Sequence, residues 1–407
     1  MSTFEVKIVR IDNVFPHPNA DRLVIVEIGG FSAIANLKDD GSWRYQPGDL
    51  VVYIPADAVL PEWLLKEMGF WNADKNKGSL NGSAGNRVKP VKLRGVFSEG
   101  ILYPVYQDIF GINQIKGDEN NLLIHVFEGQ DVAEFLNITK WEPVIPQSMA
   151  GEVFSITKLE LMERHGLSDF ASASFSTVKY DIEAWEKHVN LFEEGELIII
   201  REKLHGTFCG ISVFPDVDSE DLFESIDGQR NVMIYSKGLG GKGLCFKNNE
   251  QNANNLYVTA YKNMPYQTKS KLTKLAKQAN GFHMLGEVAG RGVQDLHYSL
   301  NTPEFFAFDF YTNRYPQGKF ADANYFEELK FALDIQEAPV LGVYPYSRET
   351  ILKFRDGNTT LGNQHIREGV VIRPVLEKFA QNLPNQRLQL KVVSPEYKLR
   401  KNATEFN

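Results

Sequence analysis

The sequence is poor in cysteine and has no long apolar run. Its 407 residues include only two cysteines, Cys209 and Cys245, and neither has a C-x-x-C or Cys/His spacing typical of a zinc site. A disulfide framework is therefore not expected. The strongest apolar runs, such as "LIII" and "LVVYIP", have the length of β-strands, so no membrane span is predicted. No secretory leader is recognisable at the N-terminus, and we expect a soluble, cytoplasmic protein.

The sequence also lacks an excess of basic residues. The formal net charge is −8 and the pI is about 5.6, which excludes a general electrostatic attraction to nucleic acid. Any phosphate must be bound by local clusters, although each cluster can equally be a solvated face. The clusters are Lys89, Lys92 and Arg94; Lys269, Lys271, Lys274 and Lys277; and Arg387, Lys391, Lys398, Arg400 and Lys401.

The length and the ordinary globular composition, with 43% hydrophobic and 24% charged residues, predict two domains. Residues 1–140 contain many short strand-like runs, such as "RLVIVEI" and "DLVVYIP", which favour a small closed β-barrel of the oligonucleotide-binding (OB) type. Residues 72–87 are rich in Gly, Asn and Ser, and we interpret them as a flexible loop. A linker is predicted over 141–152, and residues 150–407 have a mixed helix and strand pattern.

One segment of the second domain, "REKLHGTFCGI" (201–211), follows the apolar run "LIII". It predicts a strand, a tight turn at Gly206 and a return strand from Thr207. Lys203 would then lie at the lip of a sheet, where burial and nearby cations could lower the pKa of its amine and make it a nucleophile. Taken alone, K-x-x-G favours an ordinary surface lysine at a hairpin, because this four-residue pattern often occurs by chance.

The longer string "EKLHGT" resembles the adenylylation motif of ATP-dependent RNA ligases, specifically the nick-sealing, RNA ligase 2-like group. Further segments resemble the other motifs of this family in the same order. They are "YSKGLG" (235–240), "LGEVAGRGVQ" (285–294), "FFAFDF" (305–310), "EGVVIRP" (368–374) and "LQLKVVS" (388–394). Near the N-terminus, "NADRLVIVEIGG" and "VKLRGVFSEGILYPV" resemble the OB module of ligase-5-like proteins.

This resemblance implies an α+β chain: an OB-type β-barrel over 1–140, then a mixed α/β nucleotidyltransferase domain (ATP-grasp-like, with antiparallel sheets) over 150–407. It also implies roles for individual residues. The catalytic residues would be Lys203, Lys391 and Glu368. The nucleotide-binding residues would be Glu202, Leu204, His205, Lys237, Glu287, Phe308 and Lys391. Glu368 and Glu287 would hold a metal ion, through water.

The activity implied is sealing of RNA 5′-phosphate and 3′-hydroxyl ends, as in RNA repair, with ATP as co-substrate, Mg²⁺ or Mn²⁺, and a lysyl-AMP intermediate. The residue types agree with this chemistry, since carboxylates bind hydrated magnesium and an aromatic face stacks on a purine. Phe308 could equally be a core residue. The family's fifth motif often has K-x-K, whereas Gln389 and Val393 flank Lys391 here, which leaves open whether Lys242 or another lysine completes that role.

Other functions remain open at this stage. A DNA ligase or an RNA-capping guanylyltransferase uses the same lysine scheme, but these enzymes usually carry Asp where this chain has His205. A non-catalytic nucleic-acid-binding protein is favoured only by the incomplete fifth motif. The glycine-rich "SKGLGGKG" (236–243) is not a Walker A loop, because Gly243 follows Lys242 where Ser or Thr is required. It is interpreted as a flexible loop or a phosphate nest.

Overall fold

The computed structural model describes residues 3–118, 122–155, 177–215, 217–312, 319–362, 365–401 and 403–404. The chain divides into two compact units. One contains Ser2–Glu142 and Ala184–Leu191, and the other contains Pro143–Glu183 and Phe192–Asn407. The chain therefore returns once to the first unit before it builds most of the second, which no sequence pattern had indicated.

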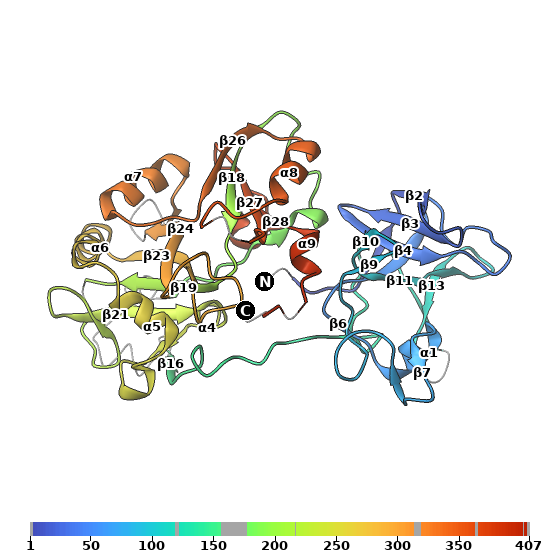
Figure 1. Ribbon diagram of the computed structural model, residues 1–407, viewed down its shortest axis with the longest axis horizontal. Helices are drawn as coiled ribbons and strands as arrows, with labels where there is room; N and C mark the ends of the chain where they lie inside the picture. The colour runs from blue at the N-terminus through green and yellow to red at the C-terminus, as the bar shows by residue number, and fades with distance from the viewer. Residues whose placement is uncertain are drawn as a thin grey trace. The chain divides into compact units, whose positions relative to one another are not determined.

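The described residues of the first unit form short antiparallel strands, a short α-helix and a 3₁₀ turn at Trp185–Lys187 (Figure 1). Its elements are β1 (Lys7–Arg10), β2 (Asn13–Pro16), β3 (Leu23–Ile28), β4 (Phe31–Asn36), β5 (Leu50–Ile54), β6 (Ala58–Val59), α1 (Glu62–Glu67), β7 (Trp71–Asn72), β8 (Lys77–Gly78), β9 (Val91–Leu93), β10 (Val96–Ser98), β11 (Ile101–Pro104), β12 (Tyr106–Gln107), β13 (Asn113–Lys116), β14 (Leu123–His125) and β15 (Thr139–Lys140). The three-stranded sheets have the orders β1-β5-β11, β2-β3-β4 and β12-β13-β14. Alternation explains the packing: in β3, Val24, Val26 and Ile28 are buried and the residues between them are not.

Residues 72–87 are more structured than a flexible loop. They contain β8, which pairs with β7, and the backbones of Gly78 and Gly85 meet there. A Cβ atom on Gly78 would lie 2.0 Å from the carbonyl oxygen of Gly85. The glycines therefore permit a close approach of two backbones, whereas the sequence analysis took them as a sign of flexibility.

The second unit contains two large antiparallel sheets. Its elements are β16 (Val153–Ser155), β17 (Glu183–Ala184), β18 (Leu197–Lys203), β19 (Thr207–Val213), β20 (Phe223–Glu224), β21 (Arg230–Ser236), α4 (Lys237–Gly240), β22 (Leu244–Phe246), α5 (Leu256–Lys262), α6 (Tyr266–Ala279), β23 (Phe282–Ala289), β24 (Glu304–Thr312), β25 (Lys319–Phe320), α7 (Ala323–Leu333), β26 (Val340–Pro345), α8 (Arg348–Arg355), β27 (Gly369–Pro374), β28 (Leu390–Val393) and α9 (Pro395–Lys398). The five-stranded sheet has the order β17-β28-β27-β18-β26, and the six-stranded sheet has the order β20-β21-β19-β23-β24-β25.

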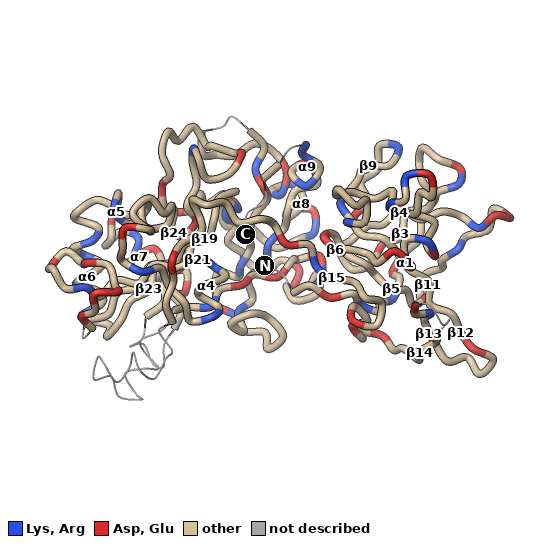
Figure 2. Tube along the Cα trace, turned by 90° about the horizontal axis from the view of Figure 1, so that it is seen from below, with Lys and Arg blue, Asp and Glu red and all other residues tan. Residues whose placement is uncertain are grey.

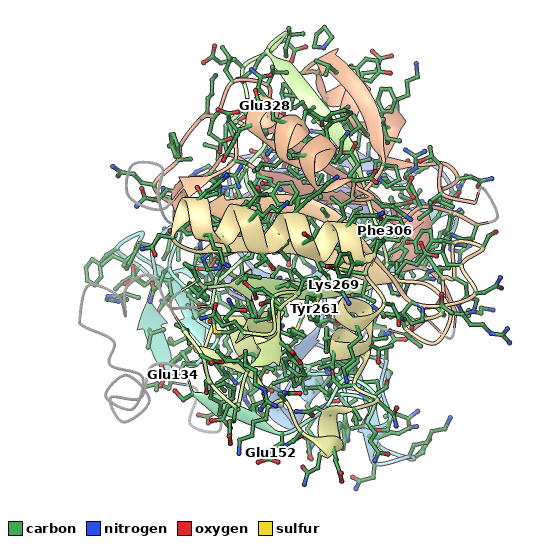
Figure 3. The ribbon with its side chains drawn as sticks, turned by 90° about the vertical axis from the view of Figure 1, so that its left-hand side faces the viewer. Glu134, Glu152, Tyr261, Lys269, Phe306 and Glu328 are labelled. Atoms are coloured by element: carbon green, nitrogen blue, oxygen red, sulfur yellow. The ribbon has the colours of Figure 1, made fainter. Side chains whose placement is uncertain are left out.

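Helices α5, α6 and α7 cover one face of the six-stranded sheet (Figures 1 and 3). The core between them includes alternate residues of β19 and buried residues of α6, such as Leu272 and Ala276. Tyr261 of α5 is also buried in this core, and the ammonium of Lys269 lies 5.1 Å from its ring centre (Figure 3). The opposite face of the sheet is left to form the wall of a cavity.

The predicted hairpin around Gly206 is wrong. β18 pairs with β26 and β27, whereas β19 pairs with β21 and β23, so the two strands lie in different sheets. The chain crosses from one sheet to the other within residues 204–206. Gly206 is needed for a close approach, because a Cβ atom there would lie 2.2 Å from the carbonyl oxygen of Val288. Lys203 consequently ends its strand at the crossing.

Charged residues of both signs are distributed along both units (Figure 2). Among the residues that the structure describes, no helix combines the length and the apolar character needed to cross a bilayer.

Candidate active site

A cavity of the second unit is lined by one face of the five-stranded sheet. In β18, β27 and β28, alternate residues point into it, because neighbouring strands keep the same pleat in register. Residues of the six-stranded sheet form another part of the lining. The first set is Ile199, Arg201, Lys203, Val371, Arg373, Gln389, Lys391 and Val393; the second is Phe208, Glu287 and Phe308.

Lys203 is held in an ion pair at the centre of this lining. Its Nζ atom lies 2.7 Å from Oε1 of Glu368, which directly precedes β27. Burial alone lowers the pKa of Lys203, but the charges of Glu368 and Glu287 outweigh it and raise the pKa above its ordinary value. The sequence pattern predicted a lowered pKa for Lys203, so the direction of that prediction is wrong. Without a nucleotide, the amine is therefore an ammonium ion that Glu368 stabilises.

The two glutamates occupy different environments. Oε1 of Glu287 accepts a hydrogen bond from the backbone N–H of Gly206 at 3.1 Å. Burial raises the pKa of Glu287 to about 7, with Lys203 opposing that shift and Glu368 adding to it. Oε2 of Glu368 is buried and has no hydrogen-bond partner within the described structure. A buried carboxylate oxygen without a partner is poised to accept a ligand.

Two further lysines complete the positive side of the cavity. Lys391 lies on β28, and burial together with the charges of Lys203 and Lys237 lowers its pKa to about 7. Lys237 begins α4, 3.0 Å from Oδ1 of Asp181, and burial lowers its pKa to about 8. The segment around Lys237 was interpreted as a flexible loop, but residues 237–240 form the short helix α4. Lys242 is exposed and lies outside the cavity lining.

Aromatic side chains line another part of the cavity. Phe308 on β24 is half-buried, and its ring centre lies 5.1 Å from that of Tyr180 and 6.0 Å from that of Phe208. Tyr180 donates to Asp309 at 3.1 Å, which fixes the orientation of its ring. This aromatic group offers a flat surface for a purine.

The remaining predicted residues lie close to the cavity but have other partners. The carboxylate of Glu202 accepts hydrogen bonds from the side chain of Thr359 and from the backbone N–H of Thr360. Leu204 lines the cavity and packs in a small apolar cluster. His205 is buried outside the cavity lining, where both of its ring nitrogens are hydrogen-bonded within the protein. Eight of the nine predicted residues thus line the cavity, with the carboxylate of Glu202 turned to Thr359 and Thr360, and His205 lies outside the lining.

Sequence reasoning missed two charged residues of the cavity lining, Arg201 and Arg373. Arg201 is paired with Glu327 and Glu337, whereas Arg373 has no such partner among the residues that the structure describes. The side chain of Arg373 is only 4% exposed, and none of its three guanidinium nitrogens has a hydrogen-bond partner in the described structure. Arg373 and Val371 lie two positions apart on β27 and point to the same face of the sheet. Val371 is the strand partner of Lys391 on β28. Strand alternation along "EGVVIRP" could have found Arg373, because residues two positions apart share a face.

The lining also fits a hydrated divalent cation. No group of three or more His, Cys, Asp or Glu side chains suited to a metal exists among the described residues. Glu287 and Glu368 nevertheless approach the same lysine, and one oxygen of Glu368 has no partner. Magnesium and manganese ions at phosphoryl-transfer sites commonly take one or two carboxylates and complete their shell with water and phosphate oxygens. The donor set agrees with that arrangement.

Comparison with protein families matches both units. The RNA ligase family model matches residues 196–393, which include the five-stranded sheet from β18 to β28 and the whole six-stranded sheet. An OB-fold domain model, described as the PHA02142 OB-fold domain, matches residues 5–105. A search of curated proteins gave no significant match.

Solved structures of Naegleria gruberi RNA ligase resemble the chain over nearly its whole length. The apo form of an Asp-to-Ala mutant aligns with a TM-score of 0.67 and 19% identity, covering 98% of both chains. A Lys-to-Ala mutant with ATP and Mn gives 0.65 and 19%, and the form with PPi gives 0.66 and 19%; both alignments cover 97% of this chain and 98% of the other. At this identity the likeness establishes the fold. The family models themselves assign residues 196–393 to an RNA ligase family domain and residues 5–105 to an OB-fold domain.

Proposed function

We propose that this protein is an ATP-dependent RNA ligase that joins a 5′-phosphate to a 3′-hydroxyl through a lysyl-AMP intermediate. The observation that carries the proposal is the cavity itself: Lys203 paired with Glu368, a second carboxylate at Glu287, two more lysines, and an aromatic wall at Phe308. The membership of this domain in the RNA ligase family supports the same conclusion.

In the first step, the neutral amine of Lys203 attacks the α-phosphorus of ATP, a P–N bond forms, and the bond to pyrophosphate breaks. The ammonium must first lose a proton, and Oε1 of Glu368 is within 2.7 Å to accept it. Lys391 and Lys237 supply positive charge near the phosphates, which stabilises the charge on the departing pyrophosphate. Phe308 holds the adenine face.

The later steps use the same pocket. A 5′-phosphate oxygen of the RNA attacks the phosphorus of lysyl-AMP, which restores the Lys203 amine and leaves AMP on the RNA end. The neighbouring 3′-hydroxyl then attacks the 5′-phosphorus, and AMP leaves. Positioning and charge stabilisation supply the catalysis, since each step only exchanges one bond to phosphorus for another.

A divalent cation would be held by Glu368 and Glu287, through water. When bound, it supplies positive charge beside the α-phosphate and offsets the negative charge that raises the pKa of Lys203. The solved Naegleria gruberi RNA ligase structures with ATP and Mn support the choice of this cofactor pair.

The proposed substrate is a nick in a duplex, with RNA at the 3′-hydroxyl side. The OB-fold domain would bind this nucleic acid, since such barrels bind oligonucleotides on one sheet face and its flanking loops. Two observations weigh against the other candidate functions: the domain matches the RNA ligase family, and all four reactive residues (Lys203, Glu287, Glu368 and Lys391) line one cavity.

The test is labelling of the protein with ATP that carries ³²P at the α-phosphate, in the presence of Mg²⁺ or Mn²⁺. The wild type should retain label after denaturation, and Lys203→Ala should not. Lys242→Ala is the matched control, because this lysine is exposed outside the cavity lining. Labelling from GTP rather than ATP would support a capping enzyme instead.

The labelled protein should then seal nicked duplexes that carry an RNA 3′-hydroxyl strand. Comparison with an all-DNA nick separates an RNA ligase from a DNA ligase. If protein that has been treated with pyrophosphate to remove bound AMP takes up no label, the lysyl-AMP mechanism is wrong and a binding protein becomes the better interpretation.

A further inference from the structure

The turn that follows the reactive lysine is attached to the C-terminal part of the chain. His205 lies two residues after Lys203, and both of its ring nitrogens are hydrogen-bonded. Nε2 lies 2.8 Å from Oδ1 of Asp295, and Nδ1 lies 2.6 Å from the hydroxyl of Tyr397. The rings of His205 and Tyr397 meet edge to face at 5.2 Å. None of these three side chains lines the nucleotide cavity.

Asp295 connects His205 to two more residues near the C-terminus. Arg400 donates to Oδ2 of Asp295, and the guanidinium of Arg400 also lies 4.1 Å from the ring centre of Tyr397. Thr404 donates to Oδ1 from both its backbone N–H and its hydroxyl, at 3.0 and 2.8 Å. Burial raises the pKa of Asp295, but the hydrogen bonds from His205 and Thr404 outweigh it and hold that pKa well below its ordinary range. The carboxylate therefore stays charged at neutral pH.

The same C-terminal segment is also anchored beside the partner of Lys203. It begins directly after β28, and the backbone N–H of Ser394 donates to the carbonyl oxygen of Glu368 at 2.8 Å. The hydroxyl of Ser394 donates to Asp356 at 2.9 Å. The C-terminal segment is thus hydrogen-bonded to Glu368, which pairs with Lys203, and also to His205, which lies in the turn that follows Lys203.

We propose that Tyr397, Arg400 and Thr404, which we call the C-terminal clamp, position the Lys203 amine for attack on the α-phosphate by fixing His205 and Asp295. The inference rests on the proposed function and adds to it a set of positioning residues that touch no substrate. It also reassigns His205: its ring would orient the lysine turn instead of binding the nucleotide, because both of its nitrogens are already hydrogen-bonded.

The physical reason for an effect on rate is alignment. A displaced nucleophile slows a reaction strongly, and a misplacement of 1 Å costs on the order of 100-fold. Lys203 attacks only in the first step. When RNA is supplied already adenylylated at its 5′ end, sealing needs the 3′-hydroxyl and the pocket but no attack by Lys203. A clamp that positions Lys203 must therefore act on the first step alone.

The experiment compares these two steps in Tyr397→Phe, which keeps the ring and removes the hydroxyl that bonds to His205. Single-turnover formation of lysyl-AMP at saturating ATP should slow by about tenfold, with the KM for ATP unchanged. Sealing of a pre-adenylylated nick should proceed at the wild-type rate. Tyr261→Phe is the matched control, because its hydroxyl bonds to Glu224 under the helices on the far face of the sheet, and both steps should keep their rates.

Thermal unfolding of each variant guards against a general loss of structure. Asp295→Asn should slow lysyl-AMP formation further than Tyr397→Phe does, and if it fails to fold, Tyr397→Phe carries the test. An equal loss in both steps, or an unchanged first step in folded Tyr397→Phe, would overturn the positioning role while leaving the ligase function in place. Absence of lysyl-AMP in the wild type would instead overturn the proposed function, and the inference with it.

Discussion

The two units of this protein differ in how deeply their ion pairs are buried, although Arg87 of the first unit is itself buried beside Asp57. In the first unit, the ion pairs Arg10–Glu128 and Lys66–Glu62 leave about half of each side chain exposed. In the second unit, Arg387 and Asp309 form an ion pair with 5% and 0% exposure. Exposed pairs contribute little to stability, whereas buried charges are costly unless they are fully paired.

Under the proposed function, the first unit supplies a surface that binds nucleic acid and the second unit supplies the site for chemistry. Around the cavity of the second unit, Lys203, Glu368 and Arg373 are all largely buried, and the last two retain polar atoms without partners. A fold selected only for stability would replace such groups with apolar ones. Perturbed and incompletely paired charges cluster where a protein binds or transforms a ligand. The predictions below test whether variants of the second unit alter ATP binding and chemistry while a variant of the first unit alters only RNA binding.

The largest effect is expected from Lys203→Arg. Arginine keeps the positive charge beside Glu368 and should preserve the fold, but its guanidinium does not lose its proton at neutral pH. Formation of lysyl-AMP should fall on the order of 1000-fold or more, while binding of nicked RNA stays unchanged. Labelling from α-³²P-ATP and a gel-shift assay measure the two quantities. Residual labelling near the wild-type level would mean that another residue is the nucleophile.

The next effect is a pH dependence that arises from Lys391. Its pKa is about 7, so its positive charge is present below that pH and is lost as the pH rises above it. Without divalent cations, the affinity for α,β-methylene-ATP should therefore fall between pH 6.5 and 8.5. Calorimetric titration should show that Lys391→Met binds about tenfold more weakly than the wild type at pH 6.5, and almost equally at pH 8.5. A smaller fall should remain in Lys391→Met, because Glu287 gains negative charge near pH 7 and Lys237 loses positive charge near pH 8.

Arg373→Met should change stability and binding in opposite directions. Removing a buried guanidinium that has no hydrogen-bond partner should raise the melting temperature of the nucleotide-free protein. The same change should weaken binding of ATP by about tenfold, the value of one charge-assisted hydrogen bond. Scanning calorimetry and titration of one preparation give both numbers. A drop in melting temperature would show that Arg373 has a structural role and that its assignment to the cavity's ligand is wrong.

The sequence predicted the chemistry better than it predicted the geometry. The strand that carries Lys203 follows from apolar alternation, which involves neighbouring residues. Glu287, Glu368 and Lys391 were assigned through the resemblance of short motifs to those of RNA ligases. The hairpin at Gly206 failed because local sequence does not show that β18 and β19 join different sheets.

Long-range partners account for the other differences. The pKa of Lys203 is raised by Glu368, a residue 165 positions away in sequence (368 − 203), and the partners of His205 lie 90 and 192 positions away. Arg373 was missed because an arginine on a strand is normally interpreted as exposed. Such contacts depend on the order of strands in the sheets, which a single sequence does not specify.

The smallest effect is expected in the first unit, at the tip of the β9–β10 hairpin. Arg94 and Gly95 form its two-residue turn, with φ angles of 43° and 91°, a conformation that favours Asn or Gly at the first position. An arginine there is unfavourable for the backbone, and Lys92 and Arg94 are both exposed without an ion pair among the described residues. The positive charges of Lys92 and Arg94 can pair with phosphate groups of a nucleic acid. Arg22 lines the same small surface hollow as Arg94 and adds a third positive charge.

Arg94→Asn separates the two contributions, since asparagine suits the turn and carries no charge. The melting temperature should stay the same or rise slightly, and the affinity for nicked RNA should fall about two- to threefold at moderate salt. The slope of log affinity against log salt should decrease by about 0.7 to 0.9, the value of one lost phosphate contact. Lysyl-AMP formation should not change, because the reactive cavity lies wholly within the second unit. If the affinity and the salt slope of Arg94→Asn both match the wild type, the basic tip is only a solvated surface and RNA binds elsewhere. If Arg94→Asn also slows lysyl-AMP formation, the first unit contributes to the chemistry and the proposed separation of roles between the two units is wrong.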